Sequence, residues 1–317
     1  ATRVINNSGK KLHSNYYDLF KYPYDNNSES LFELQWVFAG ANVWGISNSM
    51  PEYLAYSPDI AFGGWGGDKS ATWWLIKQFD GITEQPDGTL RGRTLDTRLH
   101  STFMRPGAYY PEITKVSDKA PLIYPFTGTD QNFLAVKKYV VGSPVDLAGV
   151  AAQQRYPHNT YMMRLAEMYL IYAEATIGNN ASTSDATAVE YFNKVHTRAG
   201  LPAYVVGGVN GSGPLTLDAI FSERFKEFAM EGMAWYDLVS LHYYNPSKAY
   251  SILNSQDRGL FFTRPDQMPN PTQWTFTKTS WFSERMISAN DGNFRLPIPN
   301  SEISNAPNLQ KPPVDYP

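Results

Sequence analysis

Two segments in the middle of the chain carry the helical pattern that most constrains its fold. Residues 160–178 place apolar side chains mostly three or four positions apart, and Gly178 then predicts the end of a helix. Residues 184–199 repeat the pattern, with Ser184 as the candidate N-cap. Residues 217–242 predict a third helix that packs beside the first two. The centre of the chain is therefore predicted to be helical.

The spacing inside the first two segments is similar to that of a tetratricopeptide repeat. The first helix of such a unit is matched by Leu165, Ala166 and Tyr169, and the second by Ala188 and Phe192. About ten extra residues separate the helices compared with the standard unit. Because one repeat unit cannot bury its own apolar face, we expect its neighbours to come from other parts of the chain.

The rest of the chain shows little periodicity. Residues 31–38 alternate well enough for a strand, and residues 70–80 predict a helix capped by Ser70. Residues 39–70 form a long irregular stretch, and a stretch of this length usually either binds a ligand or is disordered. Its aromatic content favours binding over disorder. Residues 243–317 are rich in Pro and Asn, and we expect them to be mostly irregular.

Composition excludes several classes of protein. The 317 residues carry a net charge of −3 and no run of Lys and Arg, which argues against nucleic-acid binding. The chain has no Cys, so disulfides, thiolate catalysis, zinc–thiolate sites and iron–sulfur clusters are excluded. The His residues show no metal-ligand spacing, and no apolar stretch reaches the roughly 18 residues of a membrane-spanning helix. We therefore predict no metal and no cofactor.

Three carboxylates recur at four-residue steps in the predicted third helix. They belong to Glu223, Glu227 and Glu231. Like charges at this spacing disfavour a helix unless cations neutralise them. Two interpretations stay open. The favoured one is a set of buried or interhelical salt bridges, and the other is a glycoside hydrolase that uses a carboxylate pair.

Three segments of the second half form a recognisable set. They are Tyr161–Ala175 (YMMRLAEMYLIYAEA), Glu223–Leu238 (ERFKEFAMEGMAWYDL) and Leu296–Leu309 (LPIPNSEISNAPNL). Together they resemble the SusD/RagB family of surface glycan-binding proteins from Bacteroidota. With weaker matches upstream, they run in family order along nearly the whole chain. Two positions depart from the family pattern, because Ala234 and Ser240 stand where Arg is usual.

The resemblance implies a mainly α fold. This fold is a tetratricopeptide-like helical scaffold, the SusD-like α/α superhelix, with long irregular, loop-rich insertions and few short strands. Residues 1–317 would form the C-terminal part of one SusD-like domain whose N-terminal part is absent. Residues 1–28 would end a repeat helix, 29–158 would form a loop-rich ligand-side region, 159–242 the tetratricopeptide-like helices and 243–317 the irregular C-terminal region.

The resemblance also implies a function. Proteins of this family are non-catalytic, bind oligosaccharides or polysaccharides, and deliver them to a SusC-like TonB-dependent transporter. The expected location is the extracellular face of the outer membrane, reached through a lipid anchor on the absent N-terminus. Two alternatives remain: the glycoside hydrolase with a carboxylate pair, and a helical-repeat scaffold that binds only protein.

The candidate glycan site lies in the irregular stretch 39–70. A sugar ring packs its C–H groups on an aromatic face, while its hydroxyls need polar partners, and this stretch supplies both kinds of group. Trp65 stands between two glycine pairs and is the first choice of stacking platform. The other candidate platforms are Trp44, Tyr53 and Tyr56, and the candidate hydroxyl partners are Asn48, Asp68 and Lys69.

Overall fold

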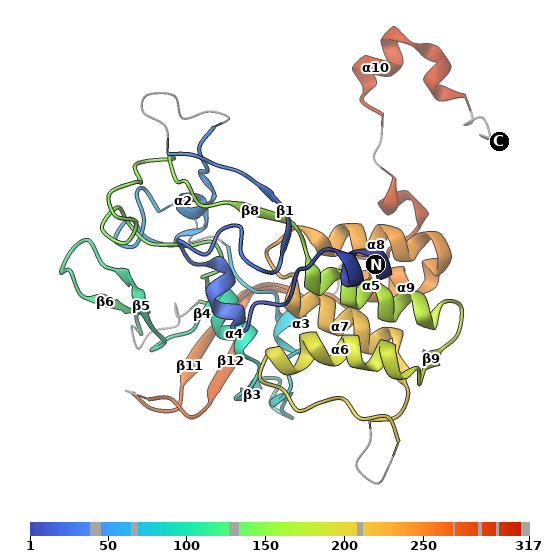
Figure 1. The fold of residues 1–317 in the computed structure, drawn as a ribbon, viewed down its shortest axis with the longest axis horizontal. Helices are drawn as coiled ribbons and strands as arrows, with labels where there is room; N and C mark the ends of the chain where they lie inside the picture. The colour runs from blue at the N-terminus through green and yellow to red at the C-terminus, as the bar shows by residue number, and fades with distance from the viewer. Residues whose placement is uncertain are drawn as a thin grey trace.

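The computed structural model of the chain describes residues 1–38, 46–64, 69–126, 133–207, 212–268, 270–284, 287–295 and 298–311. Figure 1 shows that the longer helices gather on one side of the molecule, while short strands and long loops form the other side. The C-terminal segment with helix α10 (Asn300–Asn305) stands apart from both. Among the described residues, no helix is long and apolar enough to cross a membrane. The predicted mainly α scaffold with loop-rich insertions is confirmed.

Three helices form the scaffold. They are α5 (Leu165–Ile177), α6 (Ala186–Arg198) and α7 (Leu217–Glu227), which pack against one another. Their shared core includes the fully buried Leu170 and Ile220. The predicted pair with a third helix beside it is confirmed, and Gly178 ends α5 with a positive φ of 55°.

The first scaffold helix begins five residues later than its periodicity predicts. Residues Thr160–Arg164 form strand β8, which pairs antiparallel with β1 (Ser30–Leu34), and α5 follows directly. Met162, one of the apolar side chains in the pattern of residues 160–178, is 48% exposed on this strand. The prediction was wrong here because pairing with a distant strand outweighs local helical periodicity.

The predicted third helix is two helices. After α7 the backbone turns at Met230 (φ 66°) and Gly232 (φ 79°), and α8 (Met233–Tyr244) starts in a new direction. The left-handed conformation at these two residues cannot continue a right-handed helix. Glu231 lies in this turn, so its carboxylate is not on the face of a regular helix.

The C-terminal region is more ordered than predicted. It contains α9 (Pro246–Asn254) and a long hairpin of β11 (Arg258–Pro265) and β12 (Trp274–Ser283). The hairpin extends a sheet in the order β11-β12-β3-β2, in which β2 is Ile82–Glu84 and β3 is Leu90–Gly92. Two of its prolines lie where regular structure tolerates them, Pro246 at the first turn of α9 and Pro265 at the end of β11. A high proline content therefore did not exclude regular structure.

The remaining elements are short. The predicted helix 70–80 shrinks to α3 (Trp73–Ile76), capped by Thr72 instead of Ser70. The others are α1 (Thr2–Asn7), η1 (Tyr16–Phe20), α2 (Met50–Leu54), β2 (Ile82–Glu84), β3 (Leu90–Gly92), α4 (Thr97–Thr102), β4 (Phe103–Met104), β5 (Tyr109–Thr114), β6 (Pro121–Ile123), β7 (Ala135–Val136), β9 (Ser182–Thr183), β10 (Leu215–Thr216), η2 (Asp291–Phe294) and η3 (Pro307–Gln310).

A buried network of charges joins the scaffold to the loop-rich side. Its centre is Glu227 on α7, whose carboxylate contacts Arg164 at 2.9 Å, Arg198 at 2.5 Å and Arg98 at 3.3 Å. Arg98 also contacts Glu223 at 2.6 Å. All five side chains are at most 5% exposed. We call this set, with the outer members Glu29, Asp96, Lys138 and Glu231, the buried ion network.

The buried ion network confirms the salt-bridge interpretation of the three glutamates. Burial alone would raise the pKa of each carboxyl, but the guanidinium groups around them outweigh burial and lower the pKa of Glu223, Glu227 and Glu231. On the cationic side, burial lowers the pKa of Lys138 to about 8 against the opposing charge of Glu231. The three glutamates are thus held as anions inside the molecule.

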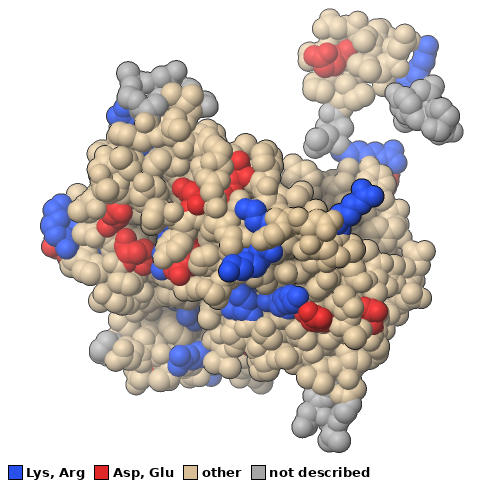
Figure 2. Space-filling model, viewed as in Figure 1, with Lys and Arg blue, Asp and Glu red and all other residues tan. Residues whose placement is uncertain are grey.

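Charged side chains are sparse on the face of the molecule that Figure 2 shows. Figure 2 shows that Lys, Arg, Asp and Glu are scattered over one face among larger uncharged areas. The closely spaced charges of the buried ion network lie in the interior instead.

Replacing Glu227 with Gln should destabilise the protein strongly. The substitution removes the negative charge that three buried guanidinium groups share. Removing one partner of a buried ion pair lowers the free energy of unfolding by about 3–5 kcal/mol. Urea unfolding measures the effect. The control is Glu190→Gln, which removes an exposed pair with Lys194 and should cost about 0.5 kcal/mol or less. Equal losses in the two variants would contradict a special role for the buried ion network.

Acid should unfold the protein through the same groups. Because the pKa of Glu223, Glu227 and Glu231 is lowered by folding, the unfolded state binds more protons once the pH falls below about 4.5. Their contribution is complete above that pH and is lost as the pH falls through the folded-state values. The free energy of unfolding, measured from pH 7 to pH 3, should fall steeply below about pH 4.5. A flat profile would show that these carboxyls keep ordinary pKa values.

Candidate functional site

The predicted glycan stretch lies on the loop-rich side, and only part of it is described. Trp44, Trp65 and Asp68 lie outside the described residues. The described part runs from residue 46 to residue 64 and contains helix α2. Four predicted site residues can therefore be placed, and they are Asn48, Tyr53, Tyr56 and Lys69.

Asn48 has a structural position. It is 3% exposed, and its amide nitrogen donates to the carbonyl of His158 at 2.8 Å and to Thr160 Oγ1 at 3.3 Å. Its Oδ1 accepts from the backbone N–H of Met50 at 2.9 Å. Its backbone pairs with Tyr156 through two hydrogen bonds. The side chain ties the stretch to residues 156–160, so in this structure its amide is not presented to a ligand hydroxyl.

The two tyrosines are half-buried and Lys69 is exposed. Tyr53 lies in the last turn of α2. Tyr56 packs edge-on against Tyr124, with ring centroids 5.0 Å apart. Burial raises the pKa of the Tyr56 phenol, and the neighbouring Tyr124 and Asp59 add to the rise. Tyr56 therefore remains a neutral hydroxyl that can donate or accept a hydrogen bond.

A groove of about 450 Å³ lies beside this stretch. Phe62 is 44% exposed in it and faces Val116 and Val145, which are 44% and 64% exposed. The other described lining residues are Pro58, Gly63, Lys119, Ser143 and Pro144. Asn48, Tyr53, Tyr56 and Lys69 are not among them. The groove is thus an apolar-walled hollow with a few polar groups at its edge, which is a composition typical of ligand sites.

Two aspartates hold the walls of the groove together. The Asp59 carboxylate accepts a hydrogen bond from the backbone N–H of Ser117 at 2.7 Å. The backbone carbonyl of Asp59 accepts one from the backbone N–H of Val116 at 2.8 Å. The Asp146 carboxylate accepts from the backbone N–H groups of Thr114 and Ser143. These bonds connect three segments that lie far apart in the sequence, and they fix the groove without a ligand.

Glu52 holds the wall of the groove in place at Gly63. Its buried carboxylate accepts from Gln154 N–H at 2.5 Å, and its Oε1 has no hydrogen-bond partner among the described residues. Gly63, with a φ of 87°, lies directly against that oxygen, so a Cβ there would clash with it. Burial raises the pKa of Glu52. The close approach positions Gly63, while Phe62 N–H donates to the Tyr156 hydroxyl at 3.0 Å.

Sequence reasoning found one wall of this groove and missed the others. Phe62 lies inside the predicted stretch, next to the glycine pair, but its exposure could not be known. The other walls come from a region with little periodicity and include Val116, Lys119 and Val145. The hydrogen bonds of Asp59 and Asp146 bring them together, and no sequence pattern predicts these bonds. Among the described residues, no group of three or more His, Asp or Glu side chains could hold a metal. The groove can bind by shape, apolar contact and hydrogen bonding.

Replacing Gly63 with Ala should cost more stability than the same change at an open glycine. Gly88 also has a positive φ, of 79°, but no atom lies where its Cβ would be. Gly88→Ala should therefore lower the free energy of unfolding by only about 1–2 kcal/mol, because a residue with a Cβ is strained in the left-handed conformation. Gly63→Ala adds the clash with Glu52 to this cost. Thermal unfolding of the two variants measures the difference. Equal costs would show that the Glu52 contact does not constrain the groove wall.

Comparison with known proteins places the chain in a family. The sequence model of the SusD family matches residues 28–314. A SusD-like protein of Bacteroides ovatus is 34% identical over 336 aligned positions, which cover all of this chain and 55% of that protein. The sequence resemblance is thereby confirmed.

Solved structures agree with this assignment. A crystal structure with a xylogluco-oligosaccharide is 30% identical, with a TM-score of 0.77, over 100% of this chain and 60% of that one. A laminarin-binding SusD-like protein is 25% identical, with a TM-score of 0.52, over 78% of this chain and 48% of that one. The chain spans about half the length of these relatives. It belongs to the SusD family.

Proposed function

We propose that this protein binds oligosaccharides without cleaving them, in the groove beside Phe62. The observation that carries the proposal is the similarity along the whole chain to a structure with a xylogluco-oligosaccharide. The groove adds a physical basis on the loop-rich side, where the sequence already suggested a sugar site. Its volume of about 450 Å³ falls within the range of small-molecule sites.

The chemistry of the groove suits a neutral sugar. Phe62 offers an exposed aromatic face for the C–H groups of a ring. Lys119 and Ser143 at the edge carry donors and an acceptor for hydroxyls. Trp65 and Asp68 follow Phe62 by only a few residues in the sequence, and we propose that they extend this surface. Trp44, Tyr53, Tyr56 and Lys69 remain proposed contacts on its margin.

The positions of the helix carboxylates support binding over hydrolysis. A glycoside hydrolase needs two carboxyl groups that face an open substrate site. Glu223 and Glu227 are at most 1% exposed, and arginines neutralise them on the scaffold side. These residues therefore give the hydrolase alternative no support.

We further propose that the bound sugar is delivered to a SusC-like TonB-dependent transporter at the outer membrane. The ground for this step is membership of the SusD family. A lipid anchor on a segment that precedes this chain in the full protein would hold it at the extracellular face. The helical scaffold would then face the transporter while the loop-rich side meets the glycan.

Isothermal titration calorimetry against xyloglucan and laminarin oligosaccharides tests the proposal. Phe62→Ala and Trp65→Ala should each weaken binding about tenfold or more, which corresponds to about 1.4 kcal/mol, because each removes an aromatic face. The control is Trp281→Ala, which removes a tryptophan 77% exposed on the distant hairpin strand β12. It should leave affinity unchanged.

The same samples are then analysed for cleavage products. Intact sugar after the titration is expected, and shortened sugar would overturn the non-catalytic part of the proposal. Binding that survives both Phe62→Ala and Trp65→Ala would place the site elsewhere on the protein. No binding to any oligosaccharide, with Phe62 and Trp65 intact, would favour a scaffold that binds only protein.

A further inference from the structure

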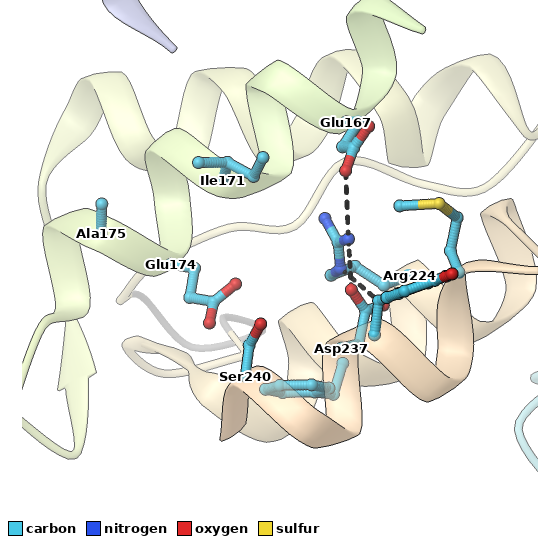
Figure 3. A pocket seen from close by; sticks show the side chains of 10 residues that line it. Glu167, Ile171, Glu174, Ala175, Arg224, Asp237 and Ser240 are labelled. Carbon is cyan, nitrogen blue, oxygen red and sulfur yellow. Dashed lines mark hydrogen bonds and ion pairs between the residues drawn. The ribbon is translucent and has the colours of Figure 1, made fainter. Parts of the chain in front are cut away.

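The groove beside Phe62 contains a cation that forms no ion pair with any carboxylate in the described part of the chain. This cation is the ammonium of Lys119. The hollow between α5, α7 and α8 shows the opposite arrangement (Figure 3). There the Arg224 guanidinium lies 2.6 Å from Asp237 and 3.7 Å from Glu167, so the protein itself supplies its partners. The cation of the groove is left for a ligand.

Lys119 is held at the groove by its own turn. It lies between β5 and β6 with a φ of 59°, and its side chain is exposed. Its Nζ donates a hydrogen bond to the backbone carbonyl of Val116, another lining residue, at 2.8 Å. The neighbouring Asp118 is engaged by Lys115 and by the backbone N–H of Ala120. An ammonium has three donors, so two donors of Lys119 remain for a ligand.

The rest of the described lining offers few polar groups. Ser143 is 2% exposed, and its hydroxyl donates to Asp146 Oδ2 at 3.4 Å, which leaves its oxygen as an acceptor. The exposed walls are the side chains of Phe62, Val116 and Val145. An unmodified sugar carries a hydroxyl on most of its ring carbons, and a hydroxyl buried without a hydrogen bond costs free energy. The groove therefore favours a sugar on which an apolar group replaces one of these hydroxyls.

Two carboxylates in the walls disfavour an anionic group. Asp59 and Asp146 hold the walls through bonds from neutral N–H and O–H groups, and neither forms an ion pair with Lys or Arg within the described ranges. A uronic acid would bring a third carboxylate to a groove whose described lining contains one ammonium. A neutral acceptor avoids this repulsion and can still accept a hydrogen bond from Lys119.

We propose that the groove recognises an acetyl group on the bound sugar. The carbonyl oxygen of the acetyl group accepts a hydrogen bond from Lys119, while its methyl group packs between Phe62 and the two valines and needs no polar partner. An O-acetyl ester and an N-acetyl amide present the same carbonyl and methyl, so either can supply this chemistry. The inference rests on the proposed glycan binding and names the class of sugar that the groove takes.

Isothermal titration calorimetry with two matched pairs of probes tests the inference on the whole chain. Xyloglucan oligosaccharides that carry O-acetyl esters are compared with the same sample after mild alkali has removed the esters. Chitotetraose, which carries N-acetyl groups, is compared with cellotetraose, which carries hydroxyls in their place. We expect the acetylated member of at least one pair to bind about tenfold more tightly, because it adds a buried methyl group and a hydrogen bond. The pair that shows the difference identifies the ester or the amide.

The outcomes separate this inference from the proposed function. Equal affinity within both pairs would overturn the acetyl group and leave glycan binding intact. Tighter binding of trigalacturonate than of every acetylated probe would show that Lys119 serves a carboxylate, and would also overturn it. No binding of any of these probes would overturn it as well, and the laminarin titration then decides the proposed function separately.

Two groove variants test the assigned contacts. Lys119→Met removes the donors and keeps an apolar side chain, so the ratio of acetylated to deacetylated affinity should fall about fivefold. Val145→Thr replaces a methyl group with a hydroxyl of similar shape and should lower the ratio too. Both side chains are exposed, so an unchanged Tm is expected and verifies the fold. The matched controls, Lys194→Met and Val205→Thr, change exposed residues outside the described lining and should leave the ratio unchanged. A ratio that survives both groove variants would overturn the proposal.

Discussion

The structure depends on Glu227 and the arginines around it. A single carboxylate on α7 is shared by side chains from α4, from the junction of β8 with α5, and from α6. Burying these charges carries a large desolvation cost, and only their close mutual contacts offset it. The network therefore fixes how four elements meet, and any other arrangement would leave an ion without a partner. Such a network contributes more to selecting one arrangement of these elements than to the total stability of the fold.

The loop-rich side is ordered by a different means. Its chain has little regular structure, so its backbone groups need side-chain partners. Asn48, Asp59 and Asp146 supply them from within the loops. Their hydrogen bonds join residues that are 32, 58 and 110 positions apart in the sequence. Asp59 and Asp146 thereby fix the walls of the groove, whose described lining residues lie outside the helices and strands.

The sequence predicts those features that arise locally. The apolar periodicity of α5 and α6 and the four-residue spacing of Glu223 and Glu227 both translate into structure. Features that arise from distant pairing stayed hidden: β8 replaced a helical turn because β1 lies beside it, and the hairpin β11–β12 formed in a proline-rich region. In the candidate site, Phe62 lies inside the predicted stretch, whereas Val116 and Val145 do not. Their meeting depends on hydrogen bonds of Asp59 and Asp146 that no local pattern reveals.

The direct junction of β8 with α5 has a consequence for ligand capture. Arg164 is both the last residue of the strand and the N-cap of the helix, and its side chain is fixed in the interior. No linker separates the loop-rich side from the scaffold at this point, so the two sides have no hinge there. A ligand that binds in the groove would meet walls that the hydrogen bonds of Asp59 and Asp146 already hold in place. The conformational entropy lost on binding would then come mainly from the ligand. A rigid oligosaccharide loses less of it than a flexible one and should bind more tightly.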